Sequence, residues 1–328
     1  MGAPDHNHLL VTENRGGMLQ ELKVSMEGNN TLNLLVDTEK MRLQTVNFGG
    51  MRLKKIILPA ADLIINSICD PDTNAKALHH LSDILSQSPL PLVNHPDDVF
   101  KTTREMTYKH LKEIDGLTVP KCVRFAPRHI ADVPVYLKDV ELEYPYIFRP
   151  AGEHGGGGMV LIRDEKELSS LEQFAFDGRD FYAIAFVDFR SDDGYYRKTR
   201  YIVIEGEVYF RHHVIAETWK IHAGSRDKLM GDGVRFREEE KRLLMSSTDP
   251  IAARCREMYE ILGLDSFGID CHIDKNGEML VFEVNSCMNT GYGTADTPKY
   301  SKYEYLQQSA DAIKSAFQTM LMHKLKRS

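Results

Sequence analysis

Two carboxylates and an amide are predicted to share one face of a strand pair in the stretch 267–289. This stretch reads FGIDCHIDKNGEMLVFEVNSCMN, and Asn276-Gly277 lies between its two alternating apolar runs. The dipeptide predicts a two-residue hairpin loop, because both residues tolerate a positive φ. Counting outward from that loop places Asp270 opposite Glu283. Because side chains alternate along a strand, these two carboxylates and Asn285 then point to the same side.

The other face of this hairpin is predicted to be core, and its residues are Ile269, Cys271, Ile273, Leu280, Phe282 and Val284. On the polar face, like charges directly opposite each other repel, so a cation is expected between Asp270 and Glu283. Two carboxylates and an amide oxygen suit a hard cation such as Mg²⁺. Taken alone, the same residues are also compatible with an acidic strand face exposed to solvent.

A second candidate site is the glycine-rich turn at 151–159. Its sequence AGEHGGGGM has five glycines and separates two predicted strands, 146–148 and 159–162. Glycines let backbone N–H groups approach an anion closely, which suits a triphosphate. The turn is neither a Walker A loop nor a GxGxxG motif opening a helix. A surface hairpin is the alternative, and Arg149, at the end of the first strand, would be a natural phosphate-binding cation.

Positive charge gathers on a predicted strand meander at 195–212, where Arg197, Lys198, Arg200 and Arg211 lie. Guanidinium groups bind phosphate or carboxylate in a forked geometry, so this meander could hold either kind of anion. A charged sheet edge that resists aggregation is equally compatible with the pattern. The spacing of residues 219–222 assigns them no role.

The elements that must position these residues follow from periodicity. In the first third, strands are predicted at 31–36, 55–58, 63–66 and 92–94, and helices at 74–85 and 97–114. This alternation is typical of a small open α/β lobe. Further along, strands are predicted at 181–189, 195–204 and 208–212, and helices at 134–142, 250–262 and 299–322. The fold class is therefore α/β.

Composition restricts the function classes. The 328-residue chain has a net charge of −7, which argues against a nucleic-acid or anionic-membrane partner. It has no long apolar run and no signal-peptide pattern, so we expect a cytoplasmic protein. The five cysteines lack CxxC spacing, which predicts neither a disulfide framework nor a zinc site.

Three features in one order resemble the ATP-grasp superfamily, which includes D-alanine:D-alanine ligase, glutathione synthetase and the ribosomal-protein glutamate ligases. They are the strand ending in Arg149-Pro150 with its glycine turn, the meander, and Asp270 thirteen residues before Glu283-Val284-Asn285. The resemblance covers residues 94–322. It implies a Rossmann-like N-terminal domain at 1–93, a small glycine-loop lobe at 94–185 and a metal and substrate lobe at 186–328. ATP is then expected between two antiparallel-sheet lobes.

The resemblance also implies site residues. Asp270, Glu283 and Asn285 would bind two Mg²⁺ ions, which Mn²⁺ could replace. A further phosphate- or adenine-side cation is expected at Lys101 or Arg104, and we favour Arg104. The expected ATP-binding residues are Arg104, Arg149, His154, Gly155, Gly156, Gly157, Gly158, Phe186, Val187 and Asp188.

The implied activity is that of an ATP-dependent carboxylate–amine ligase. It would form an amide or peptide bond through an acylphosphate and release ADP and phosphate. Small carboxylate and amine substrates, such as an amino acid or peptide, are expected as partners, and a homodimer is a family-level expectation. Alternatives are a small-molecule kinase on the same fold and a nucleotide-binding regulatory protein without turnover.

One departure from the family pattern affects the acceptor chemistry. Ligases of the D-alanine type have an arginine two residues before the metal-binding aspartate, whereas this chain has Gly268. We expect Arg200 or Arg197 to supply the missing charge as the catalytic cation.

Overall fold

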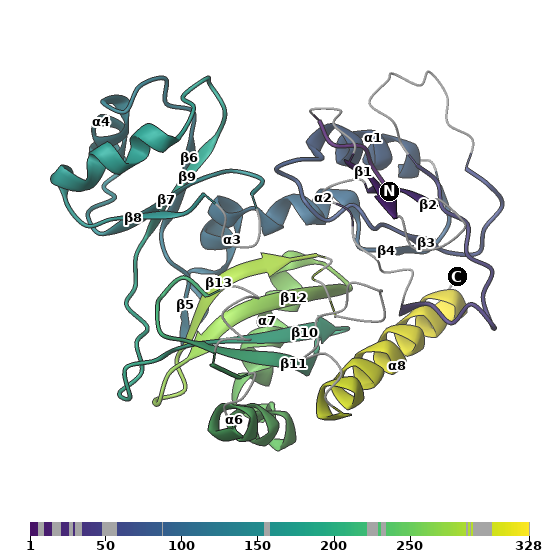
Figure 1. The fold of residues 1–328 in the computed structure, drawn as a ribbon. Coiled ribbons are helices and arrows are strands. Elements are labelled where there is room, and N and C mark those ends of the chain that lie inside the picture. The colour runs from purple at the N-terminus through teal and green to yellow at the C-terminus, as the bar shows by residue number, and fades with distance from the viewer. Residues whose placement is uncertain are drawn as a thin grey trace.

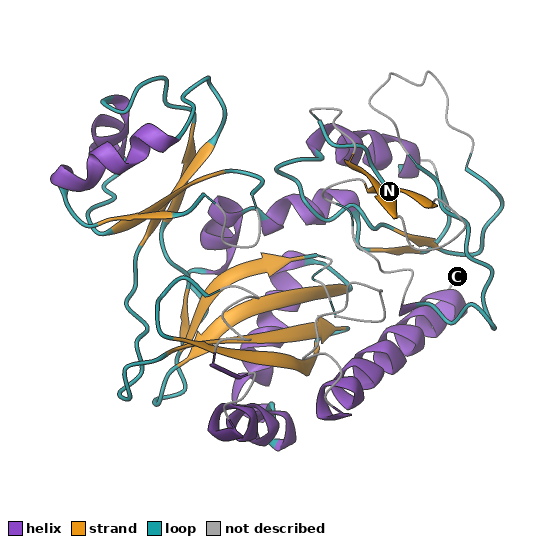
Figure 2. Ribbon diagram, viewed as in Figure 1, coloured by secondary structure: helices purple, strands orange, loops and turns teal. Residues whose placement is uncertain are grey.

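Two larger sheets with a helix between them organise the molecule (Figures 1 and 2). The computed structural model describes residues 1–5, 10–14, 21–25, 29, 35–47, 58–86, 88–153, 158–221, 229–230, 234–286, 288, 290 and 304–327. The helices are α1 (Ala75–Leu85), α2 (Pro96–Val99), η2 (Phe100–Thr102), α3 (Arg104–Leu111), α4 (Asp132–Asp139), η3 (Glu165–Gln173), α6 (Val234–Met245), α7 (Asp249–Leu262) and α8 (Glu304–Arg327). Among these residues, no helix is long and apolar enough to cross a membrane.

The strands lie in four sheets. They are β1 (Leu10–Asn14), β2 (Glu21–Ser25), β3 (Ile64–Ile65), β4 (Leu92–Val93), β5 (Leu117–Thr118), β6 (Cys122–Phe125), β7 (Tyr146–Pro150), β8 (Val160–Ile162), β9 (Phe181–Ala185), β10 (Tyr196–Ile204), β11 (Glu207–Ala216), β12 (Ser266–Ile273) and β13 (Met279–Asn285). The predicted α/β class and the antiparallel lobes are confirmed. The strands predicted at 31–36 and 55–58 lie mostly outside the described residues.

The smaller of the two main sheets carries the glycine turn. Its strand order is β6-β9-β7-β8, and every pairing in it is antiparallel. The aromatic residues Phe148 and Phe181 stack at 4.8 Å and fill a core that α4 and η3 help to cover. The pairing of β7 with β9 places Arg149 directly opposite Tyr182.

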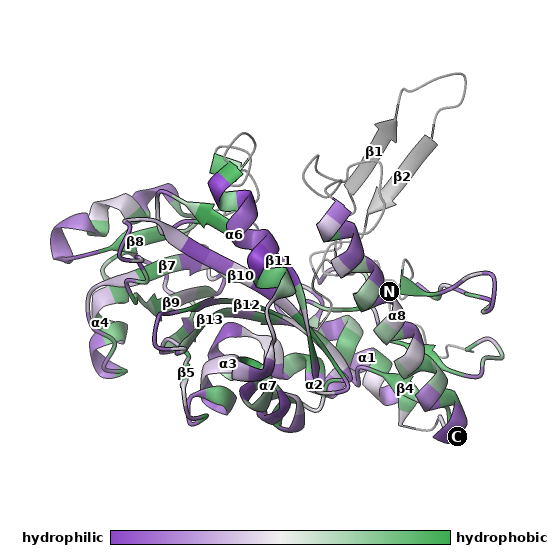
Figure 3. Ribbon diagram, turned by 90° about the horizontal axis from the view of Figure 1, so that it is seen from below, coloured by the Kyte–Doolittle hydropathy of each residue, from purple (hydrophilic) through white to green (hydrophobic). Residues whose placement is uncertain are grey.

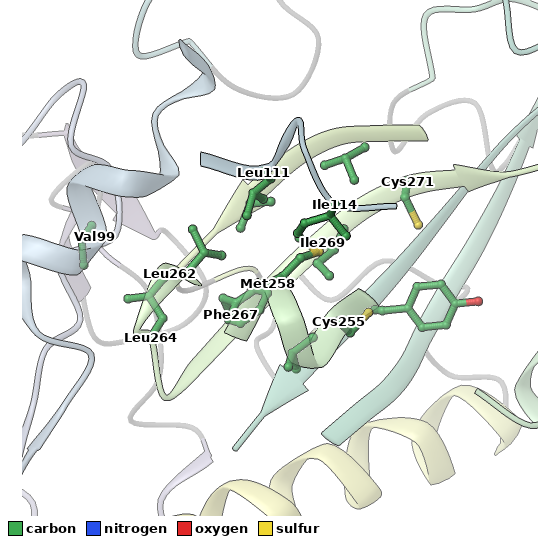
Figure 4. Close-up of a cluster of buried hydrophobic side chains, with 14 of the residues drawn as sticks. Val99, Leu111, Ile114, Cys255, Met258, Leu262, Leu264, Phe267, Ile269 and Cys271 are labelled. Carbon is green, nitrogen blue, oxygen red and sulfur yellow. The ribbon is translucent and has the colours of Figure 1, made fainter. Parts of the chain in front are cut away.

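The larger sheet carries the predicted carboxylates. Its order is β11-β10-β12-β13-β5, and only β5 pairs in parallel. Helix α7 packs on one face, where Cys255 and Met258 join Ile269 and Cys271 in a buried apolar cluster (Figure 4). Burial of this face against α7 leaves the opposite face of the sheet to carry the polar residues.

The carboxylate pairing is as predicted, although the hairpin differs from the predicted one. Asp270 pairs with Glu283, but Ile273 pairs with Met279 because the loop is longer than two residues. A bulge between Asp270 and Cys271 restores the expected register. The predicted faces are therefore wrong near the loop. Leu280 and Phe282 belong to an aromatic cluster on the opposite side from α7, while Met279 and Val281 face the core.

The long helix predicted at 97–114 is broken. Thr103 takes an extended backbone, with φ −60° and ψ 152°, between η2 and α3. The β-branched pair Thr102-Thr103 is less favourable in a helix than a straight-chain pair would be. As a result, Arg104 opens a separate helix that lies between the two larger sheets and contacts both β6 and β13 (Figure 1).

The N-terminal segment forms a third unit, and the C-terminal helix packs between it and the larger sheet. Strands β3 and β4 are parallel, and α1 follows β3. Helix α8 carries both hydrophilic and hydrophobic residues (Figure 3). Its Ile313 and Phe317 belong to the same buried cluster as Val93 and Ile202. The domain boundaries remain a prediction; β5, inside the range 94–185, is paired with β13 of the larger sheet.

Candidate active site

Asp270 is held by two cations from the neighbouring strand. Its side chain is 3% exposed, and it accepts hydrogen bonds from Arg200 Nε at 2.7 Å and Nη2 at 3.0 Å, and from Lys198 Nζ at 2.8 Å. Burial alone would raise the pKa of Asp270, but the charges of Arg200 and Lys198 outweigh it and hold that pKa well below its ordinary value. Asp270 is therefore an ionised carboxylate whose charge is neutralised by Lys198 and Arg200 of the neighbouring strand.

Glu283 is paired with the cation at the start of α3. Arg104 Nη2 lies 3.2 Å from Glu283 Oε2, and Arg104 Nη1 donates to the carbonyl of Phe282 at 2.8 Å. Burial alone would lower the pKa of Arg104, yet Glu283 raises it. The cation expected between the two opposed carboxylates is therefore supplied, in this structure, by protein side chains on either side of them.

Arg149 is a buried cation that has no carboxylate partner in the part of the chain that the structure describes. It is 3% exposed, donates to the carbonyl of Glu153 and lies 3.3 Å from Met159 Sδ, while its buried Nε has no hydrogen-bond partner among the described residues. Burial and the charge of Arg104 lower its pKa to about 10. Among the described residues, no carboxylate lies within ion-pair distance of it. An unpaired buried cation is costly, which favours a binding role over a stabilising one.

One small pocket brings part of this set together, whereas Asp270, Lys198 and Arg200 lie outside its lining. Its lining includes Arg104, Arg149, Glu283 and Asn285, with further residues from the loop 69–72 of the N-terminal unit. The walls thus come from both larger sheets, from the start of α3 and from the N-terminal unit. Such a junction between lobes is a common place for a ligand site.

The remaining predicted residues have different outcomes. Lys101 bonds Asp98 and the carbonyl oxygens at the end of α7, so Arg104, not Lys101, reaches the pocket. Arg197 lies on the other side of β10 from Arg200 and is bound by Asp193 and Glu239. His154 and Gly155–Gly157 lie outside the described residues, and Gly158 has a positive φ of 58°.

The predicted hinge joins the two larger sheets. Phe186 follows β9, donates its N–H to the carbonyl of Pro145 at 3.0 Å, and meets Trp219 edge to face at 5.7 Å. Val187 is 37% exposed, and Asp188 accepts from the N–H of Arg190. The segment is therefore placed between the lobes, although none of its residues lines the pocket described above.

Gly268 is explained by packing. A Cβ at this position would overlap the Cβ of Met288 and lie 2.8 Å from its Sδ. Met288 thus occupies the space into which a longer side chain would extend. On the adjacent strand, Ile202 pairs with Gly268 and Arg200 pairs with Asp270, so Arg200 brings a guanidinium to the same carboxylate from β10.

Sequence reasoning missed two residues near the site and gave a third, Lys198, no role of its own. Lys198 was named only as one of the meander cations, and its i,i+2 spacing from Arg200 on a predicted strand indicates the shared face that the structure shows. Asp72 and Tyr182 are hydrogen-bonded to each other at 2.7 Å across two units of the fold, and no local pattern pointed to that contact.

The oxygen atoms of Asp270, Glu283 and Asn285 are of the type that binds a hard metal ion. Asp270, Glu283 and Asn285 supply two carboxylates and an amide on one strand pair, which is the kind of set Mg²⁺ uses together with water and phosphate. Among the described residues, no group of three or more histidine, cysteine, aspartate or glutamate side chains could hold a metal. A metal here would need phosphate or water ligands besides the protein.

Comparisons with known proteins bear on the fold. No family model matches the chain, and no curated protein matches its sequence. A D-alanine–D-alanine ligase from Bacillus anthracis superposes with a TM-score of 0.52 at 13% identity, covering 90% of each chain.

Two further solved structures match less well. A RimK domain ATP-grasp protein from Sphaerobacter thermophilus has a TM-score of 0.48 at 14% identity, over 83% of this chain and 88% of that one. A carboxyaminoimidazole ribonucleotide synthase from Aspergillus clavatus has a TM-score of 0.44 at 13% identity, and the match spans 70% of this chain and 55% of that one. With its two antiparallel-sheet lobes joined at α3, this chain has the ATP-grasp fold.

Proposed function

We propose that this protein is an ATP-dependent carboxylate–amine ligase that binds ATP between its two larger sheets. The observation that carries the proposal is Arg149, a buried cation of the pocket that has no carboxylate within ion-pair distance among the described residues. The acidic residues that line the pocket, Asp70, Asp72, Glu153 and Glu283, are not paired with Arg149, and Arg104 is paired with Glu283. Asp270, Lys198 and Arg200 form an ion cluster on β10 and β12 that lies outside the lining. A triphosphate would supply the anionic partner that Arg149 lacks among the described residues.

The arginines and the lysine are suited to phosphoryl transfer by positioning and charge. The substrate carboxylate oxygen attacks the γ-phosphorus of ATP and displaces ADP, which leaves an acylphosphate. Arg200 and Lys198 bind the carboxylate of Asp270 in this structure. We assign them a second anion during the reaction, either the transferring phosphoryl group or the substrate carboxylate. Catalysis of this kind depends mainly on preorganised cations.

Amide formation completes the reaction. The amine attacks the carbonyl carbon of the acylphosphate, a tetrahedral intermediate collapses, and phosphate leaves as the nitrogen loses a proton. A divalent metal at Asp270, Glu283 and Asn285 would neutralise charge on the phosphates when bound. Arg200 is the group we assign to the oxyanion, in place of the arginine that Gly268 and Met288 exclude.

The experiment is product analysis with the purified protein, ATP, Mg²⁺ and a pool of amino acids and short peptides. We expect ADP, phosphate and a new compound one water lighter than the sum of two pool members. A stable phosphorylated pool member without amide would establish a kinase instead. ATP binding with no ADP formed across the pool would contradict the ligase and favour a regulatory nucleotide-binding protein.

Arg200→Lys is the matched variant for this assay. Lysine keeps one positive charge but cannot reproduce the two hydrogen bonds that Arg200 makes to Asp270. The proposal predicts product formation reduced by 100-fold or more, the usual size for losing an oxyanion-stabilising donor. Lys101→Gln serves as the control, because Lys101 binds helix-end carbonyls away from the pocket.

A further inference from the structure

A carboxylate from the N-terminal unit is inserted beside the glycine turn. Asp72 lies in the loop between β3 and α1, and its side chain is only 10% exposed. Its Oδ1 accepts from Tyr182 OH at 2.7 Å and from Arg124 Nη1 at 2.9 Å. Both donors belong to the smaller sheet, so one carboxylate joins two units that are far apart in sequence.

The loop around Asp72 is itself ordered by local hydrogen bonds. Asp70 Oδ1 accepts from the N–H of Asp72 at 2.9 Å, and Asp70 Oδ2 accepts from Thr73 Oγ1 at 2.7 Å. On the other side, Arg124 also binds Asp180, with Nη2 at 2.6 Å from the carboxylate. Hydrogen bonds within its own loop therefore fix the backbone of Asp72 independently of its contacts with the smaller sheet.

Asp72 reaches the candidate phosphate cation through one neighbour. Tyr182, which donates to Asp72, is the residue directly opposite Arg149 in the pairing of β7 with β9. Asp72 and Tyr182 line the same pocket as Arg149. Because its hydroxyl is held by Asp72, Tyr182 restricts the side-chain conformations open to Arg149 on the adjacent strand.

Asp72 also contacts the start of the glycine turn. The N–H of Gly152 points to Asp72 Oδ2 at 3.4 Å, which is a long and weak hydrogen bond. Gly152 has a positive φ of 76°, and a Cβ there would come within 2.7 Å of the Thr73 methyl group. Residues 72 and 73 are thus packed directly against Gly152, the second residue of the turn.

We propose that Asp72 is a positioning residue, which fixes Arg149 and the start of the glycine turn for nucleotide binding. The inference deepens the proposed function and rests on it, because it assigns Asp72 to the same ATP site. Asp72 acts through Tyr182 and Gly152 and does not itself touch the nucleotide.

The test compares ATP affinity with Mg²⁺, by calorimetric titration, in Asp72→Asn, Tyr182→Phe and the double variant. We expect Asp72→Asn to weaken ATP binding about ten-fold, or about 1.4 kcal/mol. Because both residues act through one hydrogen bond, the double variant should bind no more weakly than Asp72→Asn. Asp177→Asn is the control, since Asp177 pairs with Arg179 on the exposed surface of the same sheet region.

A second readout does not use the nucleotide. Hydrogen exchange of the Gly152 amide should be faster in Asp72→Asn and unchanged in Asp177→Asn. A structural role alone would lower the melting temperature without changing ATP affinity in the folded protein, and that result would overturn the proposal. So would unchanged Gly152 exchange.

The two proposals fail differently. Absence of ATP binding in the wild type would overturn the proposed function and, with it, the nucleotide role of Asp72. Should Asp72→Asn fail to fold, Tyr182→Phe removes only the hydroxyl, and normal ATP affinity in that variant would overturn the role of Asp72 alone.

Discussion

Replacing Asp270 by asparagine should test how much the charge of this buried carboxylate contributes to stability, separately from any role in ATP turnover. Asp270 is 3% exposed and matched by two cations, so the variant leaves Lys198 and Arg200 without their shared partner. Breaking a fully buried ion pair costs about 3–5 kcal/mol. Lys198 and Arg200 are 20% and 19% exposed and can regain some water. We therefore expect the free energy of unfolding to fall by about 2–3 kcal/mol.

The assay is urea unfolding without added metal for Asp270→Asn, Lys198→Met and the double variant. Removing one of the two uncompensated cations should restore part of the loss, so the double variant should be more stable than Asp270→Asn. Additive losses in the double variant would refute the charge-matching argument. Under the proposed function, ATP turnover should remain absent in the double variant, because restored stability would not restore the proposed metal ligand Asp270.

The pH dependence gives an independent check of the same pair. The folded pKa of Asp270 lies below its ordinary value, so its stabilisation is present above about pH 4, the pKa expected when unfolded. It is lost as the pH falls through the lower folded pKa. The difference in unfolding free energy between wild type and Asp270→Asn should therefore persist at pH 5 and shrink only in stronger acid.

Three further predictions concern packing, acid stability and ATP affinity. Gly268→Ala should lower the unfolding free energy by about 1–3 kcal/mol, because its Cβ would overlap Met288; an unchanged melting temperature would contradict this. Burial raises the pKa of Glu239, but His213 and Arg197 lower it to about 2, so Glu239→Gln should destabilise the protein by up to ~3 kcal/mol at pH 7. That difference should fade between about pH 4.5 and pH 2 in acid unfolding curves. Arg104→Gln should weaken ATP binding about ten-fold or more in a titration, whereas Lys101→Gln should leave it unchanged.

For the hairpin, the predicted pairing of the two carboxylates is correct, but the predicted loop that led to it is not. The opposition of Asp270 and Glu283 was predicted from a two-residue loop. The structure reaches it through a longer loop and a compensating bulge, neither of which alternation reveals. Periodicity locates strands well, but it does not count residues through a bulge.

The rest of the site depends on contacts between distant segments. Arg104 was favoured over Lys101 from its place in the chain, yet only the break at Thr103 shows how it turns toward Glu283. Asp72 lies 110 residues from Tyr182, and their hydrogen bond follows from how two units pack. Single-sequence patterns carry propensity and periodicity, whereas such contacts are decided by tertiary structure.

The most direct test of the proposed nucleotide site is Arg149→Met, measured for both stability and ATP affinity. Arg149 is buried, has no carboxylate within ion-pair distance among the described residues, and leaves its Nε unsatisfied. Methionine fills similar space without a charge, so the variant should be as stable as the wild type or more so. Its affinity for ATP should fall at least ten-fold. A variant that loses stability but binds ATP normally would contradict the account.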